Sequence, residues 1–594
     1  MSTLFPIILL ILVSVAISQH TSLDSSNSIC TILLEKIAVG LIFIAYIFLT
    51  LGLFHILYWW SFASCLAIMC IVSVVIKLRR VKQSEWSVVL KNLKTIKTLW
   101  LVCIAGLIFS PAIINALGPV VGYDANSYHL PIPYYYLYFL HSLDLEYLLP
   151  NNGLLPGTFG LTGFLALFGN PQASSMLTVF FSLSSYIFLV SKTKKLLLPS
   201  LLFALLLSIL SFETSSQPGN DFALVFFTLI LVNSLLSNKW RNVSNKQFTL
   251  ISLMIGYLPL IKAFAFPLSL LLLSYLIYIN QRVTIKIKLF GAFLSLFPVT
   301  LFLFFNILNF SNPLHPSFSS IFPDRYILPS AMSEVEYVTT TLPNDLKSLF
   351  TYPSLFSQAN IQFFFQVITV LLFAIALFLN ILKKNRVSEN QINIYIFGSL
   401  WVILVAEILI IGNFLRYFMF LIVPLYGFMM QTGNSSHEKS SRISRNQVKY
   451  SRMQKYFYKL NTSILLILFM VSLSSSSYFN WKPEIRSEET ISTLKQFITP
   501  RDTICLLGDH RAFLFFPNKV FVFPTNEIRN PFHNRNSFDI EVIESEIWGK
   551  CSLFLLKEDW GFPPETSIEI IEAFKEVNSP IFSEAGWLLF KQRR

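Results

Sequence analysis

Long apolar runs recur along this chain and are separated by short polar segments. Most runs are about 17–22 residues long, which matches the length of a helix that crosses the hydrocarbon core of a bilayer. A β-barrel would instead show short segments of alternating polarity. We therefore expect a polytopic α-helical membrane protein with about 11–14 spans. The pattern places spans near residues 5–19, 37–53, 57–77, 98–117, 172–190, 196–212, 220–237, 247–262, 264–279, 288–307, 361–382, 392–412, 413–431 and 461–478.

Two segments have a more ambiguous pattern. The first apolar run, Phe5–Ser18, has no basic residues before it, which favours a span over a cleaved signal peptide. The stretch 156–170 is too short for a span and predicts an interfacial or half-inserted helix.

The pattern changes sharply in the tail, where charged residues return and apolar runs shorten. Strand-like runs alternate there with helical ones, which predicts a small α/β domain. The expected strands are Thr503–Leu507, Val520–Phe523, Ser552–Leu556 and Trp587–Phe590, and the expected helices are Glu488–Phe497, Ile540–Trp548 and Thr566–Phe574.

Composition supports the membrane class. Hydrophobic residues make up 54% of the 594 residues and charged residues only 13%, whereas soluble domains carry about a quarter charged residues. The net charge of +13 does not predict nucleic-acid binding, because Lys and Arg lie in short loops between spans, where they set orientation.

The basic loops predict which ends of the spans face the cytoplasm. Seven Lys or Arg residues lie in each of the segments 77–97 and 439–459, and smaller groups lie at 192–195, 239–246, 282–288 and 383–386. All of these fall on one side of the predicted topology, which should be cytoplasmic. Three segments then lie outside: 118–171, 308–360 and 480–594.

The same reasoning divides the chain into four parts. These are N-terminal spans with a basic loop, a central membrane domain, a second basic loop with the last span, and the external α/β domain. Their ranges are 1–97, 98–431, 432–478 and 479–594.

The first external segment carries the most informative motif. Asp124, Tyr128 and His129 follow a span in a stretch, 118–156, that contains no Lys or Arg. A carboxylate can deprotonate a hydroxyl or hold a divalent metal, and His129 is within reach of the same site. His129 could also be an interfacial histidine, and the tyrosines at 134–138 are typical either of an aromatic belt or of sugar stacking.

Four more polar residues fall near the external face of this topology. Asp221 is a substrate or metal candidate, or an N-cap residue, since Asn220 or Asp221 suits the first turn of a helix. Lys262 is a phosphate ligand or a snorkelling lysine. Arg416 is a bidentate phosphate ligand or an interfacial anchor, and His315 is a site residue or a solvated loop histidine. Charged groups at membrane depth are costly, which marks such residues as functional candidates.

These motifs together resemble the GT-C superfamily of polytopic glycosyltransferases. The likeness is to bacterial members related to protein mannosyltransferases and lipid A aminoarabinose transferases. It covers roughly residues 98–430. It is carried by the order and sidedness of Tyr123-Asp124 with Tyr128-His129-Leu130-Pro131, Asn220-Asp221-Phe222, Gly256 to Lys262, Asn312–Pro316 and Arg416-Tyr417.

The resemblance implies inverting transfer of a hexose or pentose from a polyprenyl-phosphate donor to a lipid, glycan or protein acceptor. It implies a multi-pass protein of the bacterial inner membrane, with its site and tail on the periplasmic side. Asp124 would be the catalytic base or a metal-site residue, with His129 beside it. Lys262 and Arg416 would bind the donor phosphate, and Asp221, His315 and Tyr128 would contact substrate or metal. A divalent metal stays open, because Asp124 is followed by Ala125 rather than by a second acid.

Two other functions remain open. A transporter or flippase for lipid-linked glycans would place charges deep within several spans. A polymerase or ligase of the O-antigen type would also use external Arg and His on lipid-linked donors. In the tail, Cys505 and Cys551 could form a disulfide in an oxidising compartment or remain two buried thiols.

Overall fold

The computed structural model describes part of the chain. The described residues are 4–18, 29–78, 96–117, 131–141, 143, 157–168, 171–192, 220–236, 243–262, 265–310, 493–499, 501–507, 519–523, 551–557, 579–584 and 587–591, with single helical residues at 204, 207, 208, 211, 572 and 575.

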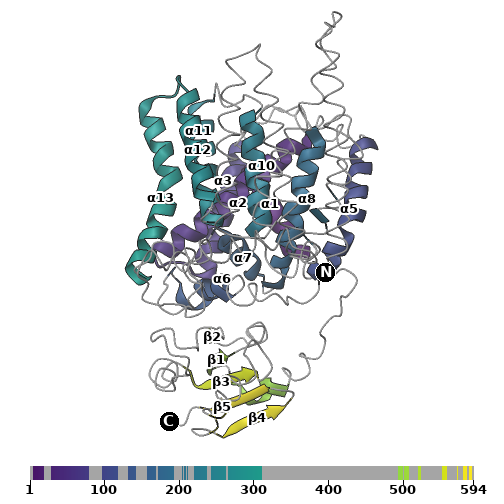
Figure 1. The fold of residues 1–594 in the computed structure, drawn as a ribbon, viewed down its shortest axis with the longest axis vertical. Coiled ribbons are helices and arrows are strands. Elements are labelled where there is room, and N and C mark those ends of the chain that lie inside the picture. The colour runs from purple at the N-terminus through teal and green to yellow at the C-terminus, as the bar shows by residue number, and fades with distance from the viewer. Residues whose placement is uncertain are drawn as a thin grey trace, which may run out of the picture.

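The described N-terminal half is a bundle of apolar helices (Figure 1). Its long helices coincide with predicted spans to within a few residues at most ends. They are α1 Leu4–Ile17, α2 Ile29–Leu53, α3 Trp59–Leu78, α5 Ile96–Leu117, α8 Ser175–Lys192, α10 Asn220–Leu236, α11 Asn245–Ile261, α12 Phe266–Ile279 and α13 Ile285–Phe310. Within the described residues, three helices are long and apolar enough to cross a membrane: Thr31–Leu53, Trp59–Ile76 and Ile285–Phe304. The membrane class is thus supported, while the larger span count stays a prediction.

Short elements connect these helices at one end of the bundle. They are α6 Pro131–Tyr135, a π-helical turn η2 Tyr136–Leu140, α7 Phe159–Ala166 and η4 Pro171–Ser174. Helix α7 falls inside the stretch 156–170, where a short helix was predicted, and all eight of its residues are buried.

Basic residues lie at one end of the bundle, which we call the basic end, and hydrogen bonds show which helix termini meet there. Thr31 and Ser191 are joined through their hydroxyls at 3.0 Å, so the start of α2 lies beside the end of α8. The N–H of Val243 donates to the side-chain oxygen of Asn280 at 3.4 Å, so α11 begins where α12 ends. Lys246 and Arg282 belong to this end. We call the opposite end, where α10 begins and α11 ends, the distal end.

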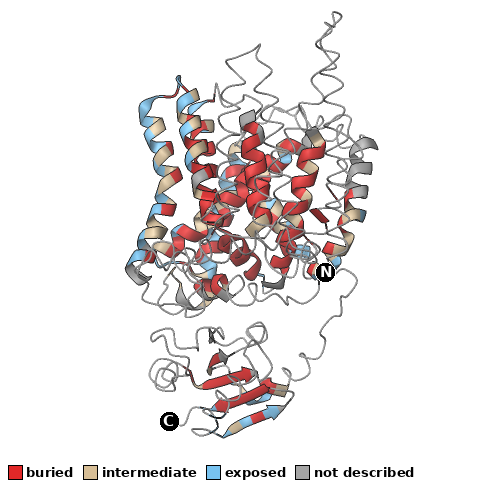
Figure 2. Ribbon diagram, in the orientation of Figure 1, coloured by how far each residue is buried: buried red, intermediate tan, exposed pale blue. Residues whose placement is uncertain are grey.

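Helix α2 lies inside the bundle, packed against helices on several sides (Figures 1 and 2). The hydroxyl of Tyr46 donates to the carbonyl of Leu253 in α11 at 3.4 Å. On α7, a side chain at Gly160 would overlap the backbone of Ala45. The N-terminal helices therefore pack directly against the region that the sequence marks as catalytic.

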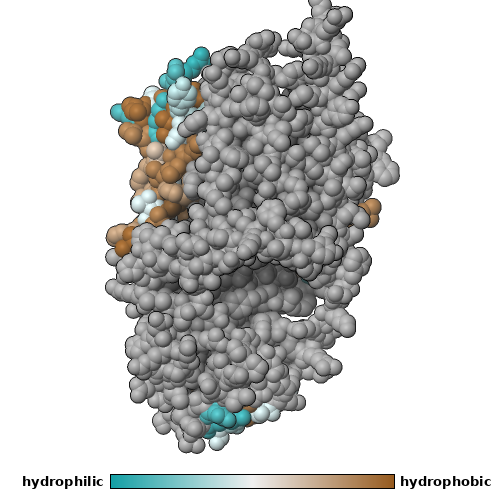
Figure 3. All heavy atoms as spheres, viewed as in Figure 1, coloured by the Kyte–Doolittle hydropathy of each residue, from teal (hydrophilic) through white to brown (hydrophobic). Residues whose placement is uncertain are grey.

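The outer helices expose apolar side chains. Figure 3 shows a brown surface along α12 and α13 below a teal, hydrophilic cap at the basic end. Exposed apolar residues on α13 include Leu289, Phe293 and Phe304, and α3 exposes Ile68 and Ile71. Surfaces of this kind suit contact with lipid tails rather than with water.

The tail forms a five-stranded mixed sheet in the order β2-β1-β3-β5-β4. The strands are β1 Thr503–Leu507, β2 Lys519–Phe523, β3 Leu553–Lys557, β4 Pro580–Glu584 and β5 Trp587–Lys591. Strand β1 pairs in parallel with β2 and β3, and β5 pairs antiparallel with β3 and β4. Four of these strands were predicted. Strand β4 was missed; it begins with a proline and lies at a sheet edge, where proline is tolerated.

The sheet carries the disulfide that was one of two expected states of its cysteines. Cys505 in β1 is bonded to Cys551 just before β3, with their Cα atoms 5.7 Å apart. Such a separation is ordinary for a disulfide. The alternative of two buried thiols is therefore wrong for this structure. Of the predicted tail helices, only residues 493–497 and the single helical residue 572 fall within the described part.

Candidate functional site

The site begins where α11 ends. A capping box starts this helix, since the Ser244 hydroxyl accepts from the Gln247 N–H and the Gln247 side chain accepts from the Ser244 N–H. At the distal end the backbone of Lys262 turns to an extended conformation, with φ −149° and ψ 132°. The chain re-enters a helix at Phe266, with a proline in the first turn of α12. Lys262 thus occupies a tight connection between two helices.

The second element of the site is the start of α10. This helix is buried on all sides from Phe222 to Val232, as expected for an interior helix that is hydrophobic all round. Asp221 lies in its first turn. A carboxylate there is favoured by the partial positive charge of the helix N-terminus. Asp221 therefore lies in the first turn of a helix, as the sequence predicted, one residue after the helix begins at Asn220.

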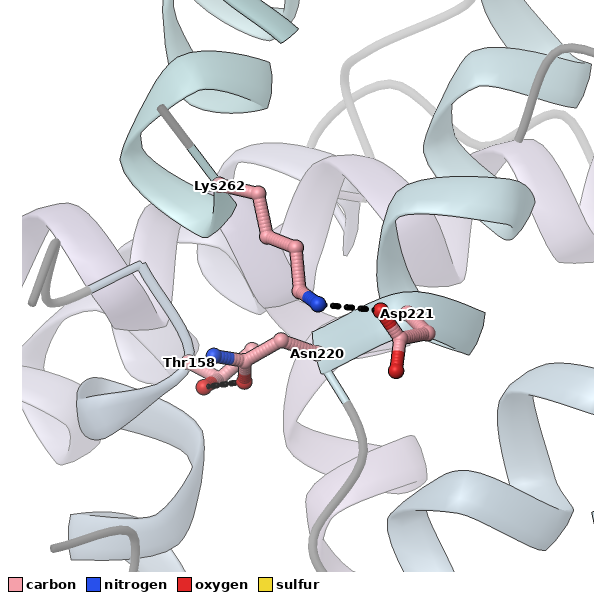
Figure 4. Close-up of polar contacts among 4 residues, drawn as sticks. All are labelled: Thr158, Asn220, Asp221 and Lys262. Atoms are coloured by element: carbon pink, nitrogen blue, oxygen red, sulfur yellow. Dashed lines mark hydrogen bonds and ion pairs between the residues drawn. The ribbon is translucent and has the colours of Figure 1, made fainter. Parts of the chain in front are cut away.

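Asp221 and Lys262 form an ion pair. The ammonium Nζ of Lys262 contacts the Oδ1 oxygen of Asp221 (Figure 4). The side chains are 18% and 11% exposed respectively. The lysine is therefore at a helix end, as the snorkelling interpretation required, but its ammonium points to a carboxylate across the helix–helix gap.

A glycine and a threonine tie the two helix ends together. The N–H of Gly157 donates to the Leu260 carbonyl at 2.7 Å, and the hydroxyl of Tyr257 donates to the Gly157 carbonyl at 2.5 Å. The next residue, Thr158, donates its hydroxyl to the side-chain oxygen of Asn220 (Figure 4). The segment before α7 thus bridges α10 and α11 beside the ion pair.

Gly157 is required by this close approach. A Cβ at this position would overlap the carbonyl of Leu260. Gly256, the first residue of the predicted glycine–lysine motif, has a different role. A Cβ there would lie 2.6 Å from the backbone of Ser295, so Gly256 permits close packing of α13 on α11. Neither role was evident from spacing alone.

Aromatic rings form the apolar floor of the site. Tyr257 packs edge-to-face on Phe227, with ring centroids 5.0 Å apart, and Phe227 contacts Phe181 at 5.8 Å. These rings are buried. The ion pair therefore lies at the end of two helices whose next turns are buried and apolar, and charges in such surroundings interact more strongly than in water.

Of the predicted site residues, the structure brings together Asp221 and Lys262. Asp124, Tyr128, His129, His315 and Arg416 lie outside the described residues, so their roles stay predictions. The bridge through Thr158 and Asn220 was not predicted, because neither residue is charged.

The described residues of the bundle do not by themselves form a metal site. A divalent cation needs several oxygen ligands, yet the acidic residues described in the bundle are Glu35 and Asp221, which lie near opposite ends. No group of three or more His, Cys, Asp or Glu residues occurs in the described part of the chain. The carboxylate of Asp221 is already paired with an ammonium.

Comparison with known families identifies one matching region of the chain but assigns no activity to it. Residues 161–431 match a family described as a domain of unknown function (DUF8201). No curated protein matches the chain. The matched region is less than half of the chain. It includes Asp221, Lys262, His315 and Arg416 and begins after Asp124.

Proposed function

We propose that this chain is a membrane glycosyltransferase that uses a polyprenyl-phosphate sugar as donor. The observation that carries the proposal is the Asp221–Lys262 pair at the distal end, opposite the basic end. A lysine held in apolar surroundings at a membrane surface suits the phosphate of a lipid whose tail lies among the helices.

The chemistry assigned to the site is an inverting displacement. An acceptor hydroxyl oxygen attacks the anomeric carbon, and the bond from that carbon to the phosphate oxygen breaks. The phosphate leaves with the electron pair as polyprenyl phosphate, and the hydroxyl proton passes to a carboxylate, which we assign to Asp124. Lys262 stabilises the charge that develops on the leaving phosphate, and Arg416 is assigned to the same group.

In this proposal Asp221 is the resting partner of Lys262. Before donor binds, the carboxylate neutralises the ammonium and fixes its position. When phosphate arrives, the ammonium is shared between the two anions, so Asp221 acts as a positioning residue.

Two observations support an external site. Basic residues gather at the opposite end of the bundle, and such residues mark the cytoplasmic side. The disulfide between Cys505 and Cys551 suits an oxidising compartment, which in bacteria is the periplasm. We therefore place the protein in the bacterial inner membrane, with the site and the tail domain on the periplasmic side.

A transporter or flippase is less well supported. Such proteins bind substrate near the midplane through polar groups deep in the membrane. Every charged residue in the described helices of the bundle lies in the first or last third of its helix or just outside it. This distribution favours chemistry at one surface over passage through the bundle. A polymerase or ligase of the O-antigen type would share the surface site and differ in donor and acceptor.

The test uses the full-length protein in nanodiscs with radiolabelled polyprenyl-phosphate hexose or pentose and an envelope fraction as acceptor. We expect free polyprenyl phosphate to appear and label to move to the acceptor. Lys262→Ala should lower the rate by about 100-fold or more, as losing a group that stabilises developing charge usually does. The matched control is Lys246→Ala, at the basic end, which should keep full activity. If the donor crosses the bilayer with its phosphate–sugar bond intact, the chain is a transporter instead.

A further inference from the structure

The turn between α2 and α3 has a fixed backbone at the distal end. His55 adopts a left-handed conformation with φ 55°, and the N–H of Ile56 bonds to the Leu51 carbonyl at 3.0 Å. This is the Schellman arrangement that closes many helices, with histidine at the position where glycine is usual. The N–H of Tyr58 then donates to the hydroxyl of Ser61 at 3.0 Å, which caps the start of α3.

A stack of three rings joins this turn to the exit of η2. The Tyr58 ring stacks on His141, with centroids 3.9 Å apart and planes at 24°, and on Trp60 at 5.5 Å and 21°. The N–H of Leu57 donates to the His141 carbonyl at 2.9 Å, and the N–H of Leu143 donates to the last turn of α2 at 3.1 Å. The turn, His141 and Leu143 therefore form one connected unit.

The outer side of this unit is apolar and exposed. Phe54 is 71% exposed, Trp59 53% and Trp60 54%. The exposed surface continues along α3 through Ile68 and Ile71. Residues 54–76 contain no Asp, Glu, Lys or Arg.

We propose that residues 54–60 are an aromatic anchor that lies in the headgroup layer of the bilayer and holds His141 and Leu143 at that depth. The partner is thus a lipid surface. The anchor joins two helices long enough to span, Thr31–Leu53 and Trp59–Ile76, and includes the first two residues of the second. Tryptophan is enriched at this level, where its amphipathic ring meets both acyl chains and water.

The length of α3 supports the assignment. Its 20 residues extend about 30 Å, which equals the thickness of the hydrocarbon core. Trp59 begins the helix and Lys77 lies at its other end. A helix with tryptophan at one boundary and lysine at the other, and lipid-facing apolar residues between them, is set at a defined depth.

A carbohydrate could also stack on an exposed tryptophan, but the surroundings favour lipid. Phe54 and Ile56 expose apolar side chains that offer a sugar no hydrogen bonds. The anchor is independent of the proposed transfer reaction. It gives the first three helices a role, because they fix the depth of the segment that continues from His141.

Tryptophan fluorescence in nanodiscs tests the anchor. The emission of Trp59 and Trp60 is obtained by subtracting the fluorescence of the Trp59→Phe/Trp60→Phe variant from that of the wild-type protein. This variant keeps an apolar ring at both positions. We expect lipids brominated near the headgroup to reduce this difference emission about two-fold or more, because tryptophans of a belt lie at that depth. Lipids brominated at the chain ends should quench it less. The matched control is Trp587→Phe; Trp587 is buried in the tail sheet, and its difference emission should not respond to either lipid.

A second measurement tests the coupling to His141. His141→Ala should speed amide hydrogen exchange at residues 52–58, whereas His141→Phe, which keeps a stacking ring, should not. The proposal is overturned if the Trp59/Trp60 emission is quenched by aqueous acrylamide and not by brominated lipid. It is also overturned if a soluble oligosaccharide protects that emission, since the turn would then be a water-facing binding surface.

Discussion

Lys262 places its ammonium on the carboxylate of Asp221, joining the end of α11 to the first turn of α10. Both side chains are mostly buried. A pair in such surroundings is stabilised by Coulomb attraction and penalised by lost hydration, so removing one partner is worse than removing both.

The first prediction concerns the energetic coupling between Asp221 and Lys262. Asp221→Asn should lower the stability of the protein by about 3 kcal/mol, because the mostly buried ammonium of Lys262 loses its carboxylate partner. The double variant Asp221→Asn/Lys262→Met should recover much of that loss. Thermal unfolding in detergent, read as a double-mutant cycle, measures the interaction. Additive losses would mean that the pair contributes no coupling energy.

The second prediction concerns the bridge before α7. Gly157→Ala should destabilise the protein by about 1–3 kcal/mol, since its Cβ forces the backbone away from Leu260. Gly106→Ala is a suitable control, because a Cβ at Gly106 meets nothing within 4 Å. Equal unfolding temperatures for the two variants would contradict the role assigned to Gly157.

The third prediction removes the hydroxyl of Tyr257. This group donates to the Gly157 carbonyl in a buried setting. Tyr257→Phe should cost about 1 kcal/mol, the usual net value of one hydrogen bond. The ring, which packs on Phe227, stays in place. Thermal unfolding beside the wild type provides the measurement, and a variant as stable as the wild type would contradict the bond.

The fourth prediction concerns the disulfide. The two cysteines are 46 residues apart, and closing a loop of that length stabilises a domain by up to about 4 kcal/mol in the chain-entropy model. Cys505→Ala/Cys551→Ala should therefore make the tail more sensitive to proteolysis. Intact mass before and after reduction under denaturing conditions should differ by two hydrogen atoms. No mass change would show that the thiols are free.

The fifth prediction is a pH dependence in the tail. Burial alone would raise the pKa of Asp502, but hydrogen bonds from Thr499 and Ser552 and the charge of Lys591 outweigh it and hold the pKa below its ordinary value. A lowered pKa in the folded state gives stability that is present above the unfolded-state pKa of about 3.9 and is lost as the pH falls through the folded value. The gain is small, because the group is largely accessible to solvent.

Hydrogen exchange at residues 503–507 measures this dependence. Protection in the wild type should fall below about pH 4, and in Asp502→Asn it should already be lower at neutral pH and change less with acid. Parallel acid profiles for the two proteins would rule out the contribution of Asp502.

Sequence patterning predicted the helices well because the length and apolarity of a run are set by the bilayer. It also placed Asp221 and Lys262 at the same end. It could not predict that they pair. Helix α10 packs against both α8 and α11, and a continuous apolar run does not indicate which face of α10 meets which neighbour. Polar residues beside the ion pair, such as Thr158, could not be singled out from the sequence, since a single uncharged polar residue is common in any loop.

The aromatic residues show the same limit of prediction from sequence patterning. The tyrosines at 134–138 fitted an aromatic belt, but Tyr136 is buried, so this ring is not part of one. Exposed rings at this end include Phe54, which pattern analysis left between two spans, and Trp59 and Trp60, which it assigned to the span 57–77. Whether an aromatic ring faces lipid or the protein interior depends on helix rotation, which a continuous apolar run leaves undetermined.

The interior position of α2 has a practical consequence. A shortened chain that starts at residue 98 would remove the wall against which α7 and α8 rest. The glycine face of α7, at Gly160 and Gly163, would lose Ala45 and Phe48 as neighbours. An apolar surface in the middle of the protein would then be exposed. Shortened versions that stop before the tail keep this wall, so trimming for expression should begin from the C-terminal side.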